Sequence, residues 1–168
     1  MRSKLFVPGS RPELFPKALA SAADALSFDL EDAVVEPRKA EARTAVAGFL
    51  GEAAGSGKCL IVRTNALQTP HFEADVDAIV RPGLDLLNLP KVESVQDVRA
   101  AVDAVERAER GRGLPAPVRL LLNIESPRGL RLAAELAAAS PRVAGLQLGY
   151  GDLFEPLQIA RREVANVH

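Results

Sequence analysis

The chain has 168 residues, of which 48% are hydrophobic and 26% are charged, and its formal net charge is −1. This length and composition predict one folded domain and argue against a largely disordered chain. The balance of 21 basic and 22 acidic residues gives no reason to expect nucleic-acid binding. A membrane span needs about 18 consecutive apolar residues, and the sequence has no such run. The start of the chain has no apolar stretch typical of a signal peptide, so we expect a cytoplasmic protein.

Six short apolar runs recur along the chain and predict buried strands, because each is rich in Leu, Val or Ile. They are Lys4–Val7, Ala25–Asp29, Cys59–Arg63, Leu86–Leu89, Arg119–Ile124 and Gly145–Leu148. Amphipathic segments between them predict helices at Arg11–Ala22, Pro37–Leu50, Ser94–Arg110 and Gly129–Ala139. The Gly-rich residues 51–58 and the Pro-rich residues 111–117 predict loops.

This alternation predicts an α/β protein with a parallel sheet and right-handed crossovers. The strands begin about every 28 residues between residues 4 and 145. Two folds fit this spacing, namely an open doubly wound sheet and a (β/α)8 barrel, and the barrel needs eight units and about 250 residues. The Gly-rich fingerprint of a dinucleotide-binding sheet is absent, since the loop after the first strand reads PGSRPE.

Ionisable residues follow five consecutive predicted strands, in the segments FDLED, VRTN, LPKVES, NIESPRG and LGYGDLF. In parallel α/β proteins the chemistry lies at the carboxyl ends of the strands, so these residues predict a functional site. A single acid after a strand is often only the N-cap of the next helix, but five consecutive ends are harder to explain in that way.

Glu125 and Asp152 form the natural metal pair, because they are hard oxygen donors after neighbouring strands. A divalent ion such as Mg²⁺ suits such a pair, whereas zinc would need nitrogen or sulfur donors. The alternative for Asp152 is that it caps a helix beginning near Leu153.

Arg63 ends an apolar strand, and a guanidinium in that position needs an anion. A substrate carboxylate is one partner, and an internal salt bridge with Glu31 or Asp32 is the other; both can hold together. Lys91 could form a Schiff base, but the nearby carboxylates favour a structural ion pair. His71 lies in the polar segment TPHFEAD, which we expect to be a solvated loop.

The segments RSKLFVPGSRPELFPKAL, DALSFDLEDAV, VRTN, LNLPKVES, NIESPRG and LGYGDL together resemble the citrate lyase β-subunit-like branch of the HpcH/HpaI aldolase superfamily. The resemblance runs from Arg2 to about Asp152. It implies a (β/α)8 TIM barrel, of which residues 1–168 would be a single domain truncated after strand six.

The resemblance also implies site residues and a reaction. Glu125 and Asp152 would hold Mg²⁺, and Arg63 and Glu125 would be catalytic. Glu31 and Asp32 would support the substrate, while the loop and helix carrying Ser10, Arg11 and Lys17 would bind the CoA phosphates. The implied enzyme is a Mg²⁺-dependent carbon–carbon lyase acting on citryl-, citramalyl- or malyl-CoA, in a homotrimer or homohexamer.

Two alternatives stay open at this stage. One is a class II pyruvate-type aldolase acting on free oxo acids, and the other is a non-catalytic metal- or acyl-CoA-binding subunit. Many relatives have Ala-Glu-Asp where this chain has Tyr150, Gly151 and Asp152, so the substrate class is in doubt.

Overall fold

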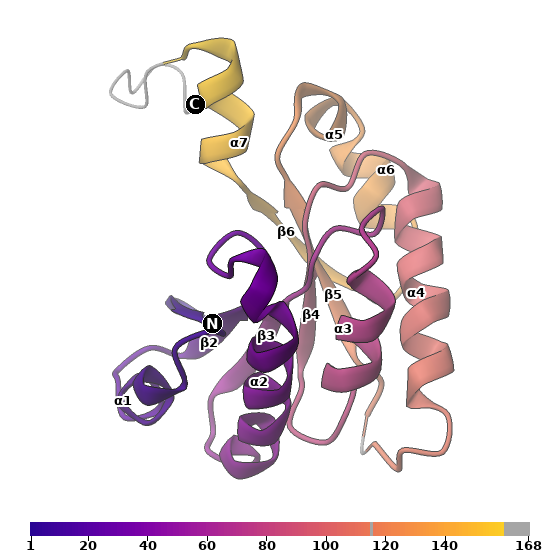
Figure 1. Ribbon diagram of the computed structural model, residues 1–168. Coiled ribbons are helices and arrows are strands. Elements are labelled where there is room, and N and C mark those ends of the chain that lie inside the picture. The colour runs from indigo at the N-terminus through magenta and orange to yellow at the C-terminus, as the bar shows by residue number, and fades with distance from the viewer. Residues whose placement is uncertain (115, 160–168) are drawn as a thin grey trace.

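A computed structural model describes residues 1–114 and 116–159 of the chain (Figure 1). All six predicted strands form, and they make one parallel sheet in sequential order. Their bounds are β1 Lys4–Pro8, β2 Ala25–Asp29, β3 Cys59–Arg63, β4 Leu86–Leu89, β5 Arg119–Ile124 and β6 Val143–Leu148. The sheet is not closed, so β1 and β6 are its two edges. The predicted α/β fold with six βα units is confirmed.

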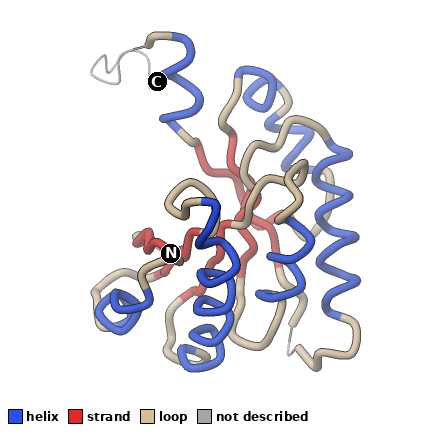
Figure 2. Tube along the Cα trace, viewed as in Figure 1, coloured by secondary structure: helices blue, strands red, loops and turns tan. Residues whose placement is uncertain are grey.

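Helices cover one face of the sheet (Figures 1 and 2). They are α1 Phe15–Leu19, α2 Lys39–Ala53, α3 Phe72–Ile79, α4 Val95–Glu109, α5 Pro127–Arg131 and α6 Ala133–Ala138. Helix α7, Tyr150–Phe154, extends beyond the end of β6, away from these helices (Figure 1). Within the described ranges, no helix is both long enough and apolar enough to cross a membrane. The sequence also predicts a helix after strand six that continues to the end of the chain, and residues 160–168 of that segment lie outside the described residues.

Several helix predictions need correction. The expected helix over residues 11–22 is only a 3-10 turn, Pro12–Leu14, followed by the short α1. Helix α2 continues to Ala53, which is buried, so the loop predicted at residue 51 begins three residues later. The segment expected as one helix at residues 129–139 is divided into α5 and α6, because the chain turns out of helical geometry at Leu132.

The prediction of a loop for TPHFEAD is wrong for its second half, because α3 begins at Phe72. Phe72, Val76 and Ile79 are almost fully buried at helical spacing, and this burial stabilises a helix despite the polar residues between them. His71 is the N-cap residue of α3, and its Nε2 lies 2.7 Å from Oε1 of Glu36 rather than only in solvent.

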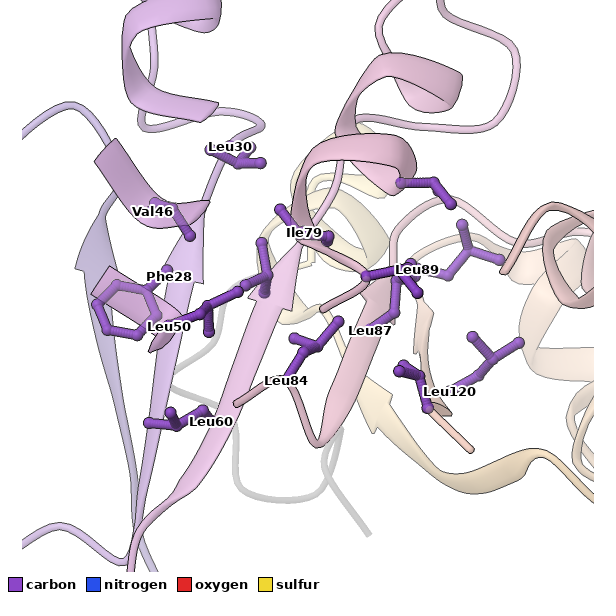
Figure 3. Close-up of a cluster of buried hydrophobic side chains, with 14 of the residues drawn as sticks. Phe28, Leu30, Val46, Leu50, Leu60, Ile79, Leu84, Leu87, Leu89 and Leu120 are labelled. Carbon is purple, nitrogen blue, oxygen red and sulfur yellow. The ribbon is translucent and has the colours of Figure 1, made fainter. Parts of the chain in front are cut away.

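The core lies between the sheet and its helices (Figure 3). Side chains alternate along each strand, so Phe28, Leu60, Leu87 and Leu120 point toward the helices. Burying each such side chain contributes about 1.5–3 kcal/mol. Leucine, valine and alanine make up most of this core, and a cluster of three phenylalanines, Phe15, Phe28 and Phe49, adds to it.

The other face of the sheet is partly polar, and this face leads to the site. It carries a small apolar cluster of Ala25, Ile61 and Leu121. Beyond that cluster, toward the carboxyl ends of the strands, lie Asn88 and Asn123, whose side chains are hydrogen-bonded to each other. Polar side chains buried on a sheet face need partners, and these two begin a chain of bonds that ends at Glu125.

Candidate active site

Arg63 and Asp29 form the centre of the polar edge. They end β3 and β2 and lie opposite each other in the parallel register. Nε and Nη2 of Arg63 donate to the two carboxylate oxygens of Asp29, each at 2.7 Å. The Arg63 side chain is only 14% exposed. This two-bond pairing fixes the plane and the direction of the guanidinium.

The loop after β2 surrounds the same guanidinium. Nη1 of Arg63 lies 3.1 Å from Oε2 of Glu31 and 3.4 Å from Oδ2 of Asp32. Asp29 also accepts hydrogen bonds from the backbone N–H groups of Glu31, at 3.0 Å, and Ala33, at 2.9 Å. The internal salt bridge that was one expectation for Arg63 is therefore present, with Asp29 as its main partner.

The ionisable groups of this cluster differ in the direction in which their pKa values are shifted. Burial favours protonation of Asp29, but the hydrogen bonds and charge of Arg63 outweigh it and lower the pKa of Asp29. Burial raises the pKa of Glu31 despite the nearby Lys91 and Arg63. Burial opposes the charge on Arg63, yet the bonds to Asp29 raise its pKa, so this guanidinium remains a permanent cation.

Lys91 joins the Glu31 cluster to Glu125. Its Nζ lies 2.9 Å from Oε1 of Glu31 and 3.7 Å from Oδ1 of Asp32. Its backbone N–H donates to Oε2 of Glu125 at 2.9 Å. The hydrogen bond to Glu31 raises the pKa of Lys91, which keeps it charged. The expected ion pair of Lys91 is thus confirmed.

Glu125 lies directly after β5 and is 7% exposed. Its Oε1 accepts a hydrogen bond of 2.8 Å from Nδ2 of Asn123, and its Oε2 accepts the bond from Lys91. Gly149 passes close beside it, and a methyl group at Gly149 would lie 2.7 Å from Oε1 of Glu125. The carboxylate is therefore held in one orientation, and a larger residue at position 149 would force the Glu125 side chain to move.

Asp152 lies in the first turn of α7, directly after β6, and is exposed. Helix α7 begins at Tyr150 with Gly149 as its N-cap, so the alternative of Asp152 as a capping residue is wrong. Asp152 is close enough to Lys91 for its negative charge to contribute to the raised pKa of Lys91.

The donor set of this edge suits a hard ion with few protein ligands. Among the described residues, no group of three or more His, Cys, Asp or Glu side chains forms a complete metal cage. Mg²⁺ binds through one or two carboxylates and takes its other ligands from water or substrate oxygens. Glu125 and Asp152 fit that requirement.

The residues expected to bind CoA lie in the loop and helix that follow β1. Oγ of Ser10 donates to the carbonyl of Ala33 at 3.3 Å, so the loop after β1 does touch the loop after β2. Arg11 forms an ion pair with Glu13 at 2.9 Å. Lys17 is exposed in the last turn of α1.

A cavity of about 430 Å³ opens beside Arg63. Its lining is Phe6, Val7, Pro8, Asp29, Ala33 and Arg63. The carbon of the Arg63 guanidinium lies 6.0 Å from the centre of the Phe6 ring, so the cavity has an apolar wall and a cationic end. Such a lining is typical of a small-molecule site.

Sequence reasoning missed two members of the site. Asp29 stands in FDLED, but only the register of β2 against β3 reveals that it is the main partner of Arg63. Asn123 is the second-last residue of β5 and stands two residues before Glu125, on the same sheet face, and this period of two is the signal that could have found it.

The sequence matches the HpcH/HpaI aldolase/citrate lyase family over residues 2–166. The chain belongs to this family. It is 42% identical over 154 residues to the L-malyl-CoA/beta-methylmalyl-CoA lyase of Cereibacter sphaeroides (strain ATCC 17025 / ATH 2.4.3), covering 90% of this chain and 48% of the relative. It is 39% identical over 161 residues to the citrate lyase subunit beta of Escherichia coli (strain K12), covering 95% of this chain and 53% of the relative.

Solved structures of the family share the fold. A citrate lyase beta subunit from M. tuberculosis, complexed with oxaloacetate and magnesium, has a TM-score of 0.72 and 33% identity. The match covers 94% of this chain and 61% of that one. Protein CitE from M. tuberculosis, in complex with magnesium, acetoacetate and coenzyme A, matches with a TM-score of 0.71 and 33% identity, over 97% of this chain and 54% of that one. The chain thus spans about half the length of its sequence relatives.

Proposed function

We propose that this chain carries the Mg²⁺ and substrate site of a carbon–carbon lyase that cleaves a hydroxyacyl-CoA such as citryl-, citramalyl- or malyl-CoA. The observation that supports this most directly is the fixed pair of opposite charges at one edge, namely the buried guanidinium of Arg63 and the oriented carboxylate of Glu125. The names of the relatives, which are CoA-ester and citrate lyases, support the same reaction class.

In this proposal Glu125 and Asp152 hold Mg²⁺, with Asn123 and the Lys91 N–H orienting Glu125. When bound, the ion supplies Lewis-acid stabilisation of negative charge on the substrate oxygens. Because the Glu125 carboxylate is already oriented, little rearrangement is needed to accept the ion.

Arg63 supplies the second positive charge. Cleavage of the carbon–carbon bond leaves the bonding electron pair on the carbon beside the carbonyl, and the resulting enolate is the main obstacle near neutral pH. Arg63 lines the cavity, and Asp29 prevents it from turning away. Removing one fixed donor of this kind typically costs about 3 kcal/mol of transition-state stabilisation, or roughly 100-fold in rate.

Glu31 and Asp32 support the substrate indirectly by holding Arg63 and Lys91. Ser10, Arg11 and Lys17 are proposed to meet the CoA phosphates, because they are polar or basic residues in the loop and helix that follow β1. A homotrimer or homohexamer is likewise a proposal, which sedimentation analysis of the purified protein would test.

The first experiment is calorimetric titration of the purified chain with Mg²⁺ and oxaloacetate, with Asp152→Asn as the control. We expect oxaloacetate to bind only when both Mg²⁺ and Asp152 are present. Acyl-CoA thioesters and free hydroxy acids are then compared as substrates. Cleavage of free acids alone would support a pyruvate-type aldolase instead, and binding without turnover of either would support a non-catalytic subunit.

The catalytic residues are tested with Glu125→Gln and Arg63→Lys. We expect each to lower turnover at least about 100-fold. Glu125→Gln removes the negative charge of a proposed cation ligand, and Arg63→Lys removes the planar guanidinium that faces the substrate. Arg63→Lys is preferred to Arg63→Ala, since alanine would leave the buried Asp29 carboxylate without its cationic partner and destabilise the fold. Turnover equal to that of the unaltered chain, in variants with unchanged circular dichroism, would rule out these roles.

A further inference from the structure

Lys91 has an unusual backbone conformation for its residue type. Its φ of 54° lies in the left-handed region, and among the described non-glycine residues only Gln158 shares this feature. The left-handed conformation costs a residue with a Cβ about 1–2 kcal/mol. Such strain persists where the surroundings hold the residue in place, and it concentrates at functional sites.

The strained conformation lets Lys91 act in two directions at once. Its backbone N–H points to Glu125, and its ammonium points to Glu31 and Asp32. The side chain is still 47% exposed, so the ammonium also faces solvent at the site. An ammonium has three donors, and it can therefore meet an anionic ligand from this position.

Carboxylates outnumber cations around Lys91. Besides Lys91 and Arg63, the Lys39 ammonium lies at this edge and donates to the backbone carbonyl of Glu31 at 3.0 Å. These three cations face five carboxylates. The carboxylates are Asp29, Glu31, Asp32, Glu125 and Asp152. Arg63 is bound to Asp29 through two hydrogen bonds, so Lys91 is a more adjustable positive charge than Arg63. An edge with this excess of carboxylates attracts a divalent cation and repels an anionic substrate.

We propose that Lys91 is a specificity-determining and positioning residue that sets the relative affinity of the site for a divalent cation and for an anionic substrate. Its ammonium weakens the binding of a divalent cation and strengthens the binding of an anionic oxo acid, while its backbone N–H orients Glu125. This inference rests on the proposed function, because it takes Glu125 and Asp152 as the cation ligands.

A purely structural role of Lys91 and a charge role of Lys91 predict different changes in ligand affinity. A purely structural tie predicts that loss of the side chain weakens both ligands. A charge effect predicts opposite signs, since removing one positive charge strengthens attraction for the cation and weakens attraction for the anion.

The experiment compares Lys91→Met, Lys91→Gly and Lys91→Arg in calorimetric titrations with Mn²⁺ and, at saturating Mn²⁺, with oxaloacetate. We expect Lys91→Met and Lys91→Gly to bind Mn²⁺ about tenfold more tightly and oxaloacetate about tenfold more weakly, as the loss of one nearby charge implies. Lys91→Arg should keep both affinities near those of the unaltered chain. Glycine relieves the strain and keeps the N–H group, so agreement between the glycine and methionine variants separates charge from distortion.

The matched control is Arg119→Met, which removes one exposed positive charge at the opposite end of the strands. It should leave both affinities unchanged. If Lys91→Met shifts both affinities in the same direction, or behaves as Arg119→Met does, the charge role of Lys91 is overturned while the proposed function stands. If the unaltered chain binds no Mn²⁺, the proposed function fails and the inference fails with it.

Discussion

At the residue scale, Asp29 is the side chain on which the polar edge depends most. It accepts four hydrogen bonds, from two nitrogens of Arg63 and from the N–H groups of Glu31 and Ala33. We expect Asp29→Asn to lower the free energy of unfolding at pH 7 by about 3 kcal/mol, because it removes one partner of a buried ion pair. Urea unfolding followed by circular dichroism measures this change.

The same variant tests the lowered pKa of Asp29. Below the ordinary value of 3.8, the unfolded carboxyl takes up a proton before the folded one does, so acid favours the unfolded chain. The stabilisation from Asp29 is therefore present above that pH and lost below it. The difference between the unaltered chain and Asp29→Asn should shrink as the pH falls from about 5 to 3. A difference that stays constant over this range would contradict the assigned pairing.

At the scale of elements, a buried network joins α2 and α3 to the loop after β3. Asp75 on α3 is 1% exposed and accepts hydrogen bonds from Arg43 on α2 and from the backbone and side chain of Asn65. Asn65 accepts in turn from Lys39, whose Nζ also donates to the carbonyl of Glu31. Helices α2 and α3 lie outside the site. Through these bonds they help to position the loop after β2, whose Glu31 and Asp32 contact Arg63.

We expect Asp75→Ala to lower the free energy of unfolding by about 3–5 kcal/mol, because it leaves buried donors without acceptors. Amide hydrogen exchange at Glu31 should also become faster. The control is Glu73→Ala on the same helix, which breaks an exposed ion pair with Arg107 and should cost less than about 1 kcal/mol. Equal losses in the two variants would show that the buried network does not carry the stability of this region.

At the scale of the whole molecule, the sequence predicted what local patterns encode. All six strands were predicted, because continuous apolar runs mark strands buried in a parallel sheet. Helix α3 was missed, because burial of Phe72, Val76 and Ile79 overrides the polar residues of TPHFEAD. The Arg63–Asp29 pairing depends on strand register, and the conformation of Lys91 depends on contacts with the loops after β2 and β5. Neither feature can be predicted from the residues adjacent to it in the sequence.

The two edges of the open sheet are linked across the polar face. Nζ of Lys4 on β1 donates to Oε1 of Gln147 on β6, and the ammonium lies 4.3 Å from the centre of the Phe6 ring. Burial, followed by the charge of Arg63, lowers the pKa of Lys4 to about 8. The chain thus places a cation where its charged form is disfavoured, at a contact between its first and last strands.

The lowered pKa of Lys4 predicts that Lys4 changes how the stability of the chain depends on pH in the alkaline range. Because the pKa of Lys4 is lower in the folded chain than its ordinary value of 10.5, the folded chain releases the proton first as the pH rises. Folding is therefore favoured by alkali across that interval, and Lys4→Met should lack this gain. The melting temperature of the unaltered chain, minus that of Lys4→Met, should increase between pH 7 and pH 10, since every other group titrates equally in both. A difference independent of pH would mean that Lys4 keeps its ordinary pKa and that the polar face between β1 and β6 is open to water.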